Sequence, residues 1–465
     1  MQRRRLVAAG AALAVVVVLV VAVIALAGGG DGGKASPPAN AAASLVPADA
    51  LVYVHLSTDP GREQTQDAAK VVASFPSWRR LRDGIVSRLQ APGCDVATKA
   101  LKGADEAALA IFDTGGRAAN SLVLVDTGKE HPGARQQACG SLSSTYVGTF
   151  LAIGQPESLS LAARLHKAGG KGSLARAAGP RREMGQLPAD RVADGWLSAD
   201  GLRRLLAPQG GLLGAAGVLF DQPTLKGAAF GVGAKGDRVT LTVKSQLDPA
   251  LKTGGAAGFK PFEATLASSV PADAMAYLGV SNLAPALQRL LAAAGSSSDT
   301  IKKLAGSLDE PLLKVFPGEA AVVLTQSTPA PILTILAAAK DEAQARKALA
   351  GLPAAVRRTL SSAVWDGKVA VSTSPQGIAA VRAKGKHLSD TTNWTKTVGN
   401  HPERLSSLLF LDFTRLLTLG EATGLGDSSA YQAAKGDLDK IQAIGASTTG
   451  NDSESTAEIS LLVTQ

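Results

Sequence analysis

Aromatic side chains are scarce in this chain. They make up 4% of 465 residues, whereas 45% of the residues are hydrophobic. The protein cores must therefore be built mainly from small aliphatic side chains. No dense run of basic residues with interleaved aromatics accompanies the net charge of +9, so nucleic acid is not a predicted partner. The length indicates two or three domains.

Catalytic motifs are also missing. No G-x-S-x-G stretch occurs, so the usual hydrolase arrangement has no basis. None of the histidines pairs at i, i+4 or stands in a known ligand spacing with a carboxylate; they are His55, His131, His166, His387 and His401. His55 lies on an apolar strand and is expected to be a core or surface residue. We predict no enzyme, metal or cofactor.

Two glycine-rich stretches resemble nucleotide-binding loops without meeting their requirements. GVGAKG at Gly231 has the spacing G-x-G-x-x-G, but a β-branched alternating segment follows it instead of a helix. We therefore predict a hairpin turn there. AGGKGS at Ala168 follows a helical segment with the wrong spacing for a phosphate loop, which indicates a helix C-terminal turn.

The N-terminus contains the strongest local signal. Leu6 to Ala27 carry no charge and as a helix would span about 33 Å, enough for a bilayer core of roughly 30 Å. Residues 1–5 include three arginines, which should stay cytoplasmic and place the rest outside as a single-pass protein. The alternative is secretion after cleavage near Ala27, where Ala-Leu-Ala resembles a signal-peptidase site. No cysteine follows the apolar run, which excludes a lipoprotein.

Residues 28–43 are rich in glycine, proline and alanine and lack periodicity, so we predict a flexible tether. The chain's two cysteines, Cys94 and Cys139, lie beyond it. In an exported protein they can form a disulfide, and two buried free thiols are the alternative. A catalytic cysteine is not expected, because no histidine is suitably placed.

The chain repeats itself at long range. VPADALVYV from Val46 returns as VPADAMAYL from Val270, 224 positions later. Further matches follow in the same order, so the sequence predicts a domain duplication, with modules at residues 44–250 and 251–465. The matched stretches are helical segments at Asp67–Gln90 and Leu283–Leu308, strands at 103–112 and 318–325, strands from Ser121 and Ile332, helices from Ala134 and Ala345, strand–turn–helix segments from Ser143 and Ser361, and closing strand pairs from Gly227 and Ala443.

Each module begins with the order strand, helix, strand, strand, helix, strand. This is the βαββαβ order of ferredoxin-like folds, here extended by further helices and a hairpin. We therefore expect an α+β fold, with a transmembrane helix followed by two duplicated modules. In each module a mainly antiparallel sheet should carry helices packed on one face.

The basic N-terminus, apolar anchor, low-complexity tether and "PADA" strand opening each module resemble a bacterial family filed as domain of unknown function 3352. The resemblance covers roughly Ala43 to Gln465. It implies an exported, often membrane-anchored protein. It implies no activity and no functional residues.

Two groups of residues remain as candidate sites. Asp49 and Asp273 recur in the two halves, as do Asp200 and Asp412. Paired carboxylates could serve a glycosidase, but we expect the first two in turns and the second two as helix N-caps. The uncharged stretch at 205–220 is expected to be a buried helix and turn, or else a contact surface for an apolar ligand, membrane or partner, through Leu205, Leu206, Leu212, Leu213, Val218, Leu219 and Phe220.

These observations favour a non-enzymatic binding or scaffolding module of the cell envelope, held in the bilayer by residues 6–27. Its partner would be an envelope protein or an apolar ligand. The alternatives are a carrier of an apolar or lipid ligand and, with less support, an envelope hydrolase.

Overall fold

The computed structural model describes residues 37–59, 61–80, 83–84, 104–113, 119–206, 224–251, 261–283, 317–328, 330–352 and 354–464. The chain divides into two compact units between Leu251 and Lys252. The predicted anchor at residues 6–27 lies outside the described residues, as does the first part of the tether. No helix in the described ranges is long and apolar enough to cross a bilayer.

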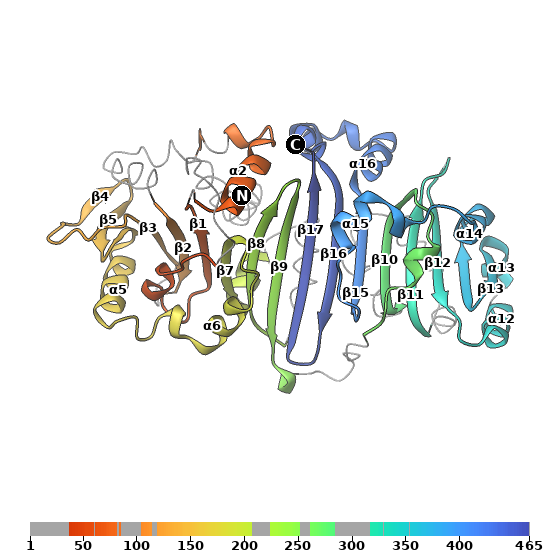
Figure 1. Ribbon diagram of the computed structural model, residues 1–465, viewed down its shortest axis with the longest axis horizontal. Coiled ribbons are helices and arrows are strands. Elements are labelled where there is room, and N and C mark those ends of the chain that lie inside the picture. The colour runs from red at the N-terminus through yellow and green to blue at the C-terminus, as the bar shows by residue number, and fades with distance from the viewer. Residues whose placement is uncertain are drawn as a thin grey trace. The chain divides into compact units, whose positions relative to one another are not determined.

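Unit 1 is an antiparallel sheet in the order β4-β5-β6-β3-β2-β1-β7-β8-β9 (Figure 1). Its strands are β1 (Val52–Ser57), β2 (Glu106–Phe112), β3 (Asn120–Asp126), β4 (Gln137–Cys139), β5 (Leu142–Val147), β6 (Phe150–Gly154), β7 (Arg191–Ser198), β8 (Leu225–Lys235) and β9 (Arg238–Leu247). Its helices are η1 (Ala42–Leu45), α2 (Glu63–Ala73), α5 (Pro156–Lys167), η2 (Leu174–Arg176), α6 (Ala178–Gly185), α7 (Ala199–Leu206) and η3 (Pro249–Leu251).

Unit 2 repeats this plan in the order β13-β14-β12-β11-β10-β15-β16-β17. Its strands are β10 (Ala274–Asn282), β11 (Pro317–Thr325), β12 (Ile332–Ala338), β13 (Ser361–Trp365), β14 (Lys368–Ser372), β15 (Ser407–Asp412), β16 (Ile441–Gly450) and β17 (Glu454–Val463). Its helices are η4 (Leu266–Ser269), α12 (Glu342–Ala350), α13 (Ala354–Thr359), α14 (Pro375–Arg382), η5 (Leu388–Asp390), α15 (Thr392–Val398), α16 (Phe413–Ala422), η6 (Leu425–Asp427) and α17 (Ser429–Leu438).

The two central strands occupy the same register in their sheets. Tyr53 on β1 pairs with Ala110 and Trp196. Its counterpart 224 residues later, Tyr277 on β10, pairs with positions 323 and 410. The connection before α6 and α15 matches as well, because Leu174 N donates to Val46 O at 2.8 Å and Leu388 N donates to Val270 O at 2.8 Å. Residues can therefore be compared between the units position by position.

The tertiary structure confirms the α+β class with antiparallel sheets and corrects four details. The ferredoxin-like pairing is wrong, since β1 lies directly beside β2 and antiparallel to it. The helix predicted from Ala134 is instead the short strand β4, whereas the matching segment at Ala345 lies in α12 as predicted. Helices also cover both faces of each sheet. The predicted tether ends before residue 43, because Ala42 and Ala43 are buried.

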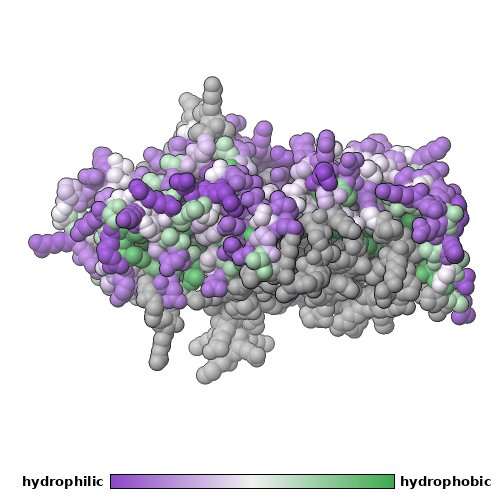
Figure 2. All heavy atoms as spheres, turned by 90° about the horizontal axis from the view of Figure 1, so that it is seen from below, coloured by the Kyte–Doolittle hydropathy of each residue, from purple (hydrophilic) through white to green (hydrophobic). Residues whose placement is uncertain are grey.

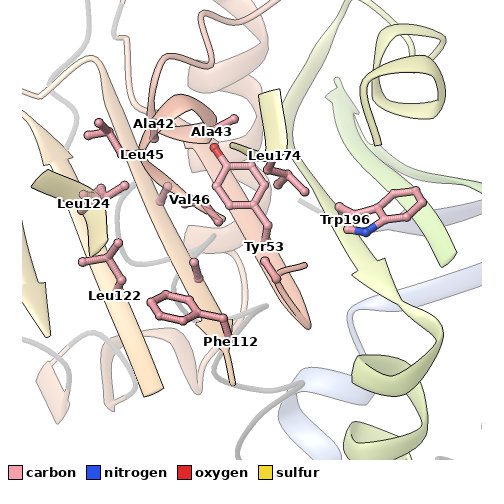
Figure 3. Packing of buried hydrophobic residues seen from close by; sticks show 14 of the residues in the cluster. Ala42, Ala43, Leu45, Val46, Tyr53, Phe112, Leu122, Leu124, Leu174 and Trp196 are labelled. Carbon is pink, nitrogen blue, oxygen red and sulfur yellow. The ribbon is translucent and has the colours of Figure 1, made fainter. Parts of the chain in front are cut away.

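Burial on both faces explains why the strands lack clean alternation. All six residues of β1 are buried. Alternate β1 side chains belong to two clusters, one that includes Ala68 of α2 and one that includes Leu159 of α5 and Tyr53. Around Tyr53 the core is made largely of alanine, valine and leucine, as Figure 3 shows. A strand with two apolar environments carries no period of two in its sequence.

The outer surface is mostly polar. Figure 2 shows one face on which hydrophilic side chains predominate and hydrophobic ones form small separate areas between them. Leu425 is the one large hydrophobic side chain in the described ranges that is exposed, at 39%.

The two equivalent tyrosines give a matched test of what a hydrogen bond to a buried hydroxyl contributes to stability. Tyr53 Oη donates to Asn40 Oδ1 at 2.5 Å, whereas Tyr277 Oη is buried without a hydrogen-bond partner among the described residues. We predict that Tyr53→Phe lowers the free energy of unfolding by about 1 kcal/mol and that Tyr277→Phe leaves it unchanged or raises it, since a buried unpaired hydroxyl is itself unfavourable. Urea unfolding of both variants measures this. Equal losses would contradict it.

Candidate functional site

Among the described residues, four buried charged side chains lie together at the centre of unit 1. We call these four residues the charge cluster. They are His55 on β1, Glu106 on β2, and Arg191 and Asp194 on β7. His55 and Asp194 are 0% exposed, Glu106 is 2% and Arg191 is 8%. Charged side chains are almost never this deeply buried unless they are paired, and these four pair with one another.

His55 lies between the two carboxylates. Its Nδ1 is 3.0 Å from Asp194 Oδ1, and its Nε2 is 3.6 Å from Glu106 Oε1. The second oxygen of Asp194 accepts a hydrogen bond from Arg191 Nε at 2.5 Å. Arg191 Nη1 then donates to Pro188 O at 2.8 Å. The chain of contacts joins β2, β1 and β7 across the sheet.

The surroundings shift the two acids in opposite directions. Burial would raise the pKa of Asp194, but the hydrogen bonds and charges of His55 and Arg191 outweigh it and lower that pKa below its ordinary value. Burial raises the pKa of Glu106, and the opposing effects of His55 and two backbone N–H groups do not cancel it. Burial, followed by the charges of Glu106 and Asp194, also raises the pKa of Tyr53 well above its ordinary value.

The charge cluster also holds the segment that enters unit 1. Glu106 accepts hydrogen bonds from Ala42 N at 2.7 Å and from Ala41 N at 3.1 Å. Asn40 Nδ2 donates to Asp194 Oδ1 at 3.1 Å, and Asn40 Oδ1 accepts from Tyr53. In Figure 3 the Tyr53 hydroxyl points toward Ala42 and Ala43. We call residues 40–42, with these bonds, the entry clamp.

Unit 2 keeps the carboxylate bonds of the clamp and lacks the bonds of Asn40 and the rest of the cluster. Glu319, the counterpart of Glu106, accepts from Leu266 N at 3.0 Å and from Thr265 Oγ1 at 2.6 Å. Burial again raises its pKa. The positions that match His55, Asp194 and Arg191 in register are apolar or small; they are Gly279, Leu408 and Leu405. These three charged positions are therefore specific to unit 1.

The cluster has the parts of an acid–base pair but is closed to substrates. A histidine bonded to an aspartate is the usual arrangement of a general base and its orienting group. Here both side chains are 0% exposed, so a reacting group could reach them only after the sheet opened. The contacts of the cluster instead hold three strands and residues 40–42 together.

A second polar feature lies in unit 2, beside β15, α15 and α16 (Figure 1). It is a cavity of about 140 Å³ that we call the β15 cavity, lined by Ala272, Leu388, Thr391, Thr392, Asn393, Phe410, Asp412 and Arg415. Asp412 Oδ1 accepts from Arg415 N at 3.1 Å and so caps α16. Its Oδ2 lies 3.5 Å from Arg415 Nε, in an ion pair whose arginine side chain is 39% exposed.

The four aspartates named from the sequence occupy different structural positions. Asp412 is an N-cap, as predicted, and also lines the β15 cavity. Asp200 lies within the first turn of α7, and the cap there is Ser198, whose Oγ accepts from Gly201 N at 3.0 Å. Asp49 and Asp273 are exposed in turns, as expected from the preceding prolines. Those turns are closed by backbone bonds to the proline carbonyls.

The other predicted features are partly described. The glycine turns are where they were expected, with Gly236 between β8 and β9 and Gly169 after α5, both at positive φ. Cys139 ends β4 and is disulfide-bonded, and Cys94 lies outside the described residues. Leu205 and Leu206 end α7. Outside the described residues lie Leu212, Leu213, Val218, Leu219 and Phe220.

Among the described residues no three His, Cys, Asp or Glu side chains are grouped to hold a metal ion. His131 stacks on Tyr146 with ring centroids 3.9 Å apart. The sequence did not reveal that His55 pairs with two buried carboxylates, because these partners are 51 and 139 residues away. The available signal was one or two ionisable residues within each of three otherwise apolar strands. Such a residue must find a partner when its strand is buried.

The opposite pKa shifts predict opposite pH responses in unit 1. Asp194 has a lowered pKa in the folded state, so its contribution to stability is present above about pH 4 and is lost as the pH falls toward that lower pKa. Glu106 has a raised pKa, so stability falls as the pH rises from about 4.3 and the buried acid ionises. Asp194→Asn should remove the first dependence and Glu106→Gln the second. Hydrogen exchange of β1 amides against pH measures this, and unchanged profiles in both variants would contradict it.

The disulfide predicted between Cys94 and Cys139 is testable by mass. Alkylation without reductant should add nothing, and alkylation after reduction should modify both thiols. Closing a loop of 45 residues stabilises a fold by about 4 kcal/mol in the chain-entropy model. We therefore expect Cys139→Ser to unfold at lower urea. Labelling of either thiol in the unreduced protein would refute the pairing.

Comparison with known proteins gives little further information. No family model matches the chain, and no curated protein matches it. Crystal forms III and I of the treponemal protein TP0453 are structurally similar at 12% and 8% identity, with TM-scores of 0.24 and 0.25. These matches cover 45% and 47% of this chain and 81% of that protein in each case.

Proposed function

We propose that this protein is a single-pass, membrane-anchored, extracytoplasmic binding or scaffolding protein of the bacterial cell envelope, without enzymatic activity. Its two units would be the products of a duplication. The repeated sequence and the matched registers of β1 and β10 support a common origin. The resemblance to domain of unknown function 3352 is consistent with this role.

The observation that carries the proposal is the entry clamp. Asn40 and Ala41 directly precede η1 (Ala42–Leu45), the first element of unit 1, and buried groups of three strands hold residues 40–42. A membrane-anchored domain gains from such a bond, because the point where the tether joins the fold must resist fraying. Chain termini are poorly ordered unless they are tied down in this way.

The division of polar residues between the units supports binding over catalysis. In unit 1 the charged side chains are buried within the sheet, and their contacts join its strands. In unit 2 the equivalent core is apolar, and polar side chains line the β15 cavity. We infer that unit 1 joins the protein to its anchor and that unit 2 presents a surface to a partner.

The test of this function is crosslinking in living cells. Photoactivatable residues placed on the exposed surface of unit 2, for example at Thr392 or Lys396, should capture defined envelope neighbours. The same residue placed at exposed Arg181 of unit 1 is the matched control. Capture of cytosolic proteins from both positions would overturn the proposal.

The anchor itself predicts a simple fractionation result. The full chain should sediment with membranes and resist extraction by high salt, since about 22 apolar residues span a bilayer core. A variant with Val17→Asp and Val21→Asp should leave the membrane fraction, because each buried charge costs about 3 kcal/mol in such a helix. Recovery of the unmodified full-length chain in a soluble fraction would contradict anchoring.

A further inference from the structure

The lining of the β15 cavity differs from the matching described positions of unit 1. Position by position, unit 1 has small residues where unit 2 has polar ones. The positions equivalent to Thr391, Thr392 and Asn393 are Ala177, Ala178 and Gly179. The positions equivalent to Asp412 and Arg415 are Ser198 and Gly201. The cavity is thus a local departure from a shared framework.

Unit 1 has no room for a side chain like Arg415. A Cβ added to Gly201 would lie 1.9 Å from Leu51 O, so α7 touches the backbone of its sheet directly. A Cβ on Gly179 would lie 2.9 Å from Gln246 Oε1. In unit 2 the chain accommodates full side chains at the same places, and space remains among them.

Several polar groups that line the β15 cavity make few or no hydrogen bonds within the described residues. Arg415 Nη1 donates to Ala272 O at 3.4 Å and its Nε pairs with Asp412 at 3.5 Å, which are long contacts. Its Nη2 makes no further hydrogen bond in the described ranges. The side chains of Thr392 and Asn393 also make none there. Thr391 is occupied, since its Oγ1 donates to Leu388 O at 2.8 Å.

These groups define the chemistry of a ligand. A guanidinium beside an amide and a hydroxyl suits a carboxylate, which accepts hydrogen bonds from all three. The neighbouring Asp412 carboxylate would repel a doubly charged phosphate and requires a hydrogen-bond donor close to the ligand's own carboxylate. The volume of about 140 Å³ is below the roughly 300 Å³ of pockets for whole drug-sized ligands, so the cavity suits an end group.

We propose that the β15 cavity binds a carboxylate with a hydrogen-bond donor on the adjacent carbon, as found in a free amino acid or at the C-terminus of a peptide. Arg415 and Asn393 hold the carboxylate, and Asp412 accepts from the neighbouring N–H. Aliphatic contact comes from Leu388 and Phe410. The inference rests on the proposed binding role and adds a ligand class to it.

The experiment uses the full chain in detergent with four probes, observed by saturation-transfer NMR and titration. Alanine and N-acetylalanine carry both required groups, propionate lacks the donor, and N-acetylalanine amide lacks the carboxylate. We expect at least one of the first two to bind at least tenfold more tightly than propionate and the amide. Binding of alanine alone identifies a free amino acid, and binding of N-acetylalanine alone identifies a peptide end.

Variants locate the site. Arg415→Gln should weaken binding at least tenfold, whereas Arg382→Gln, the same change at an arginine that stacks on Trp365 elsewhere in unit 2, should have no effect. Asn393→Asp leaves the Arg415–Asp412 pair in place and adds a repelling charge, so it should also abolish binding. This second variant decides the matter if Arg415→Gln does not fold.

Three results would overturn the inference: no binding of either acid, equal binding of the amide, or equal effects of the two arginine variants. Asp412→Asn keeps an N-capping residue and should selectively weaken alanine, whose ammonium group needs the charge. A negative result here leaves the crosslinking test unaffected. That test fails separately if unit 2 has no envelope neighbours.

Discussion

A carboxylate bonded to the segment that enters each unit, buried in unit 1 and half-buried in unit 2, is the interaction on which the two folds depend. Glu106 holds Ala41 and Ala42, and Glu319 holds Thr265 and Leu266 at the matching positions. A buried carboxylate without partners is strongly unfavourable, and so are backbone N–H groups with none. Each group therefore needs the other. Together they fix where the chain begins to fold against the first strand.

The units have built different polar structures on this shared base. In unit 1 His55, Asp194 and Arg191 extend the carboxylate into a network across three strands. Each buried charge of this network has a partner in the folded sheet, and removing one partner would leave an unfavourable unpaired charge. In unit 2 the matching positions are Gly279, Leu408 and Leu405, so no charged network joins the strands there. Polar side chains are instead placed at the end of β15, where solvent reaches them.

Several features were predictable because they depend on local order in the chain. The strand-forming segments, the proline-started helices at Pro156 and Pro375, and the glycine turn at Gly236 all lie where the sequence indicates. The helix expected from Ala134 failed because it was inferred by analogy with Ala345. Nearby glycines at Gly133 and Gly140, both at positive φ, instead favour turns that flank a short strand.

The sequence by itself determined that a long apolar N-terminal segment precedes two copies of one α+β pattern, since periodicity and repetition are properties of the linear chain. Only the tertiary structure decided which strands are neighbours. It alone brought His55 to Asp194, 139 residues away, and opened a cavity beside Arg415 where unit 1 has Gly201. These outcomes depend on packing between distant segments. Hydrophobic patterning specifies that such segments must be buried but not against which partner.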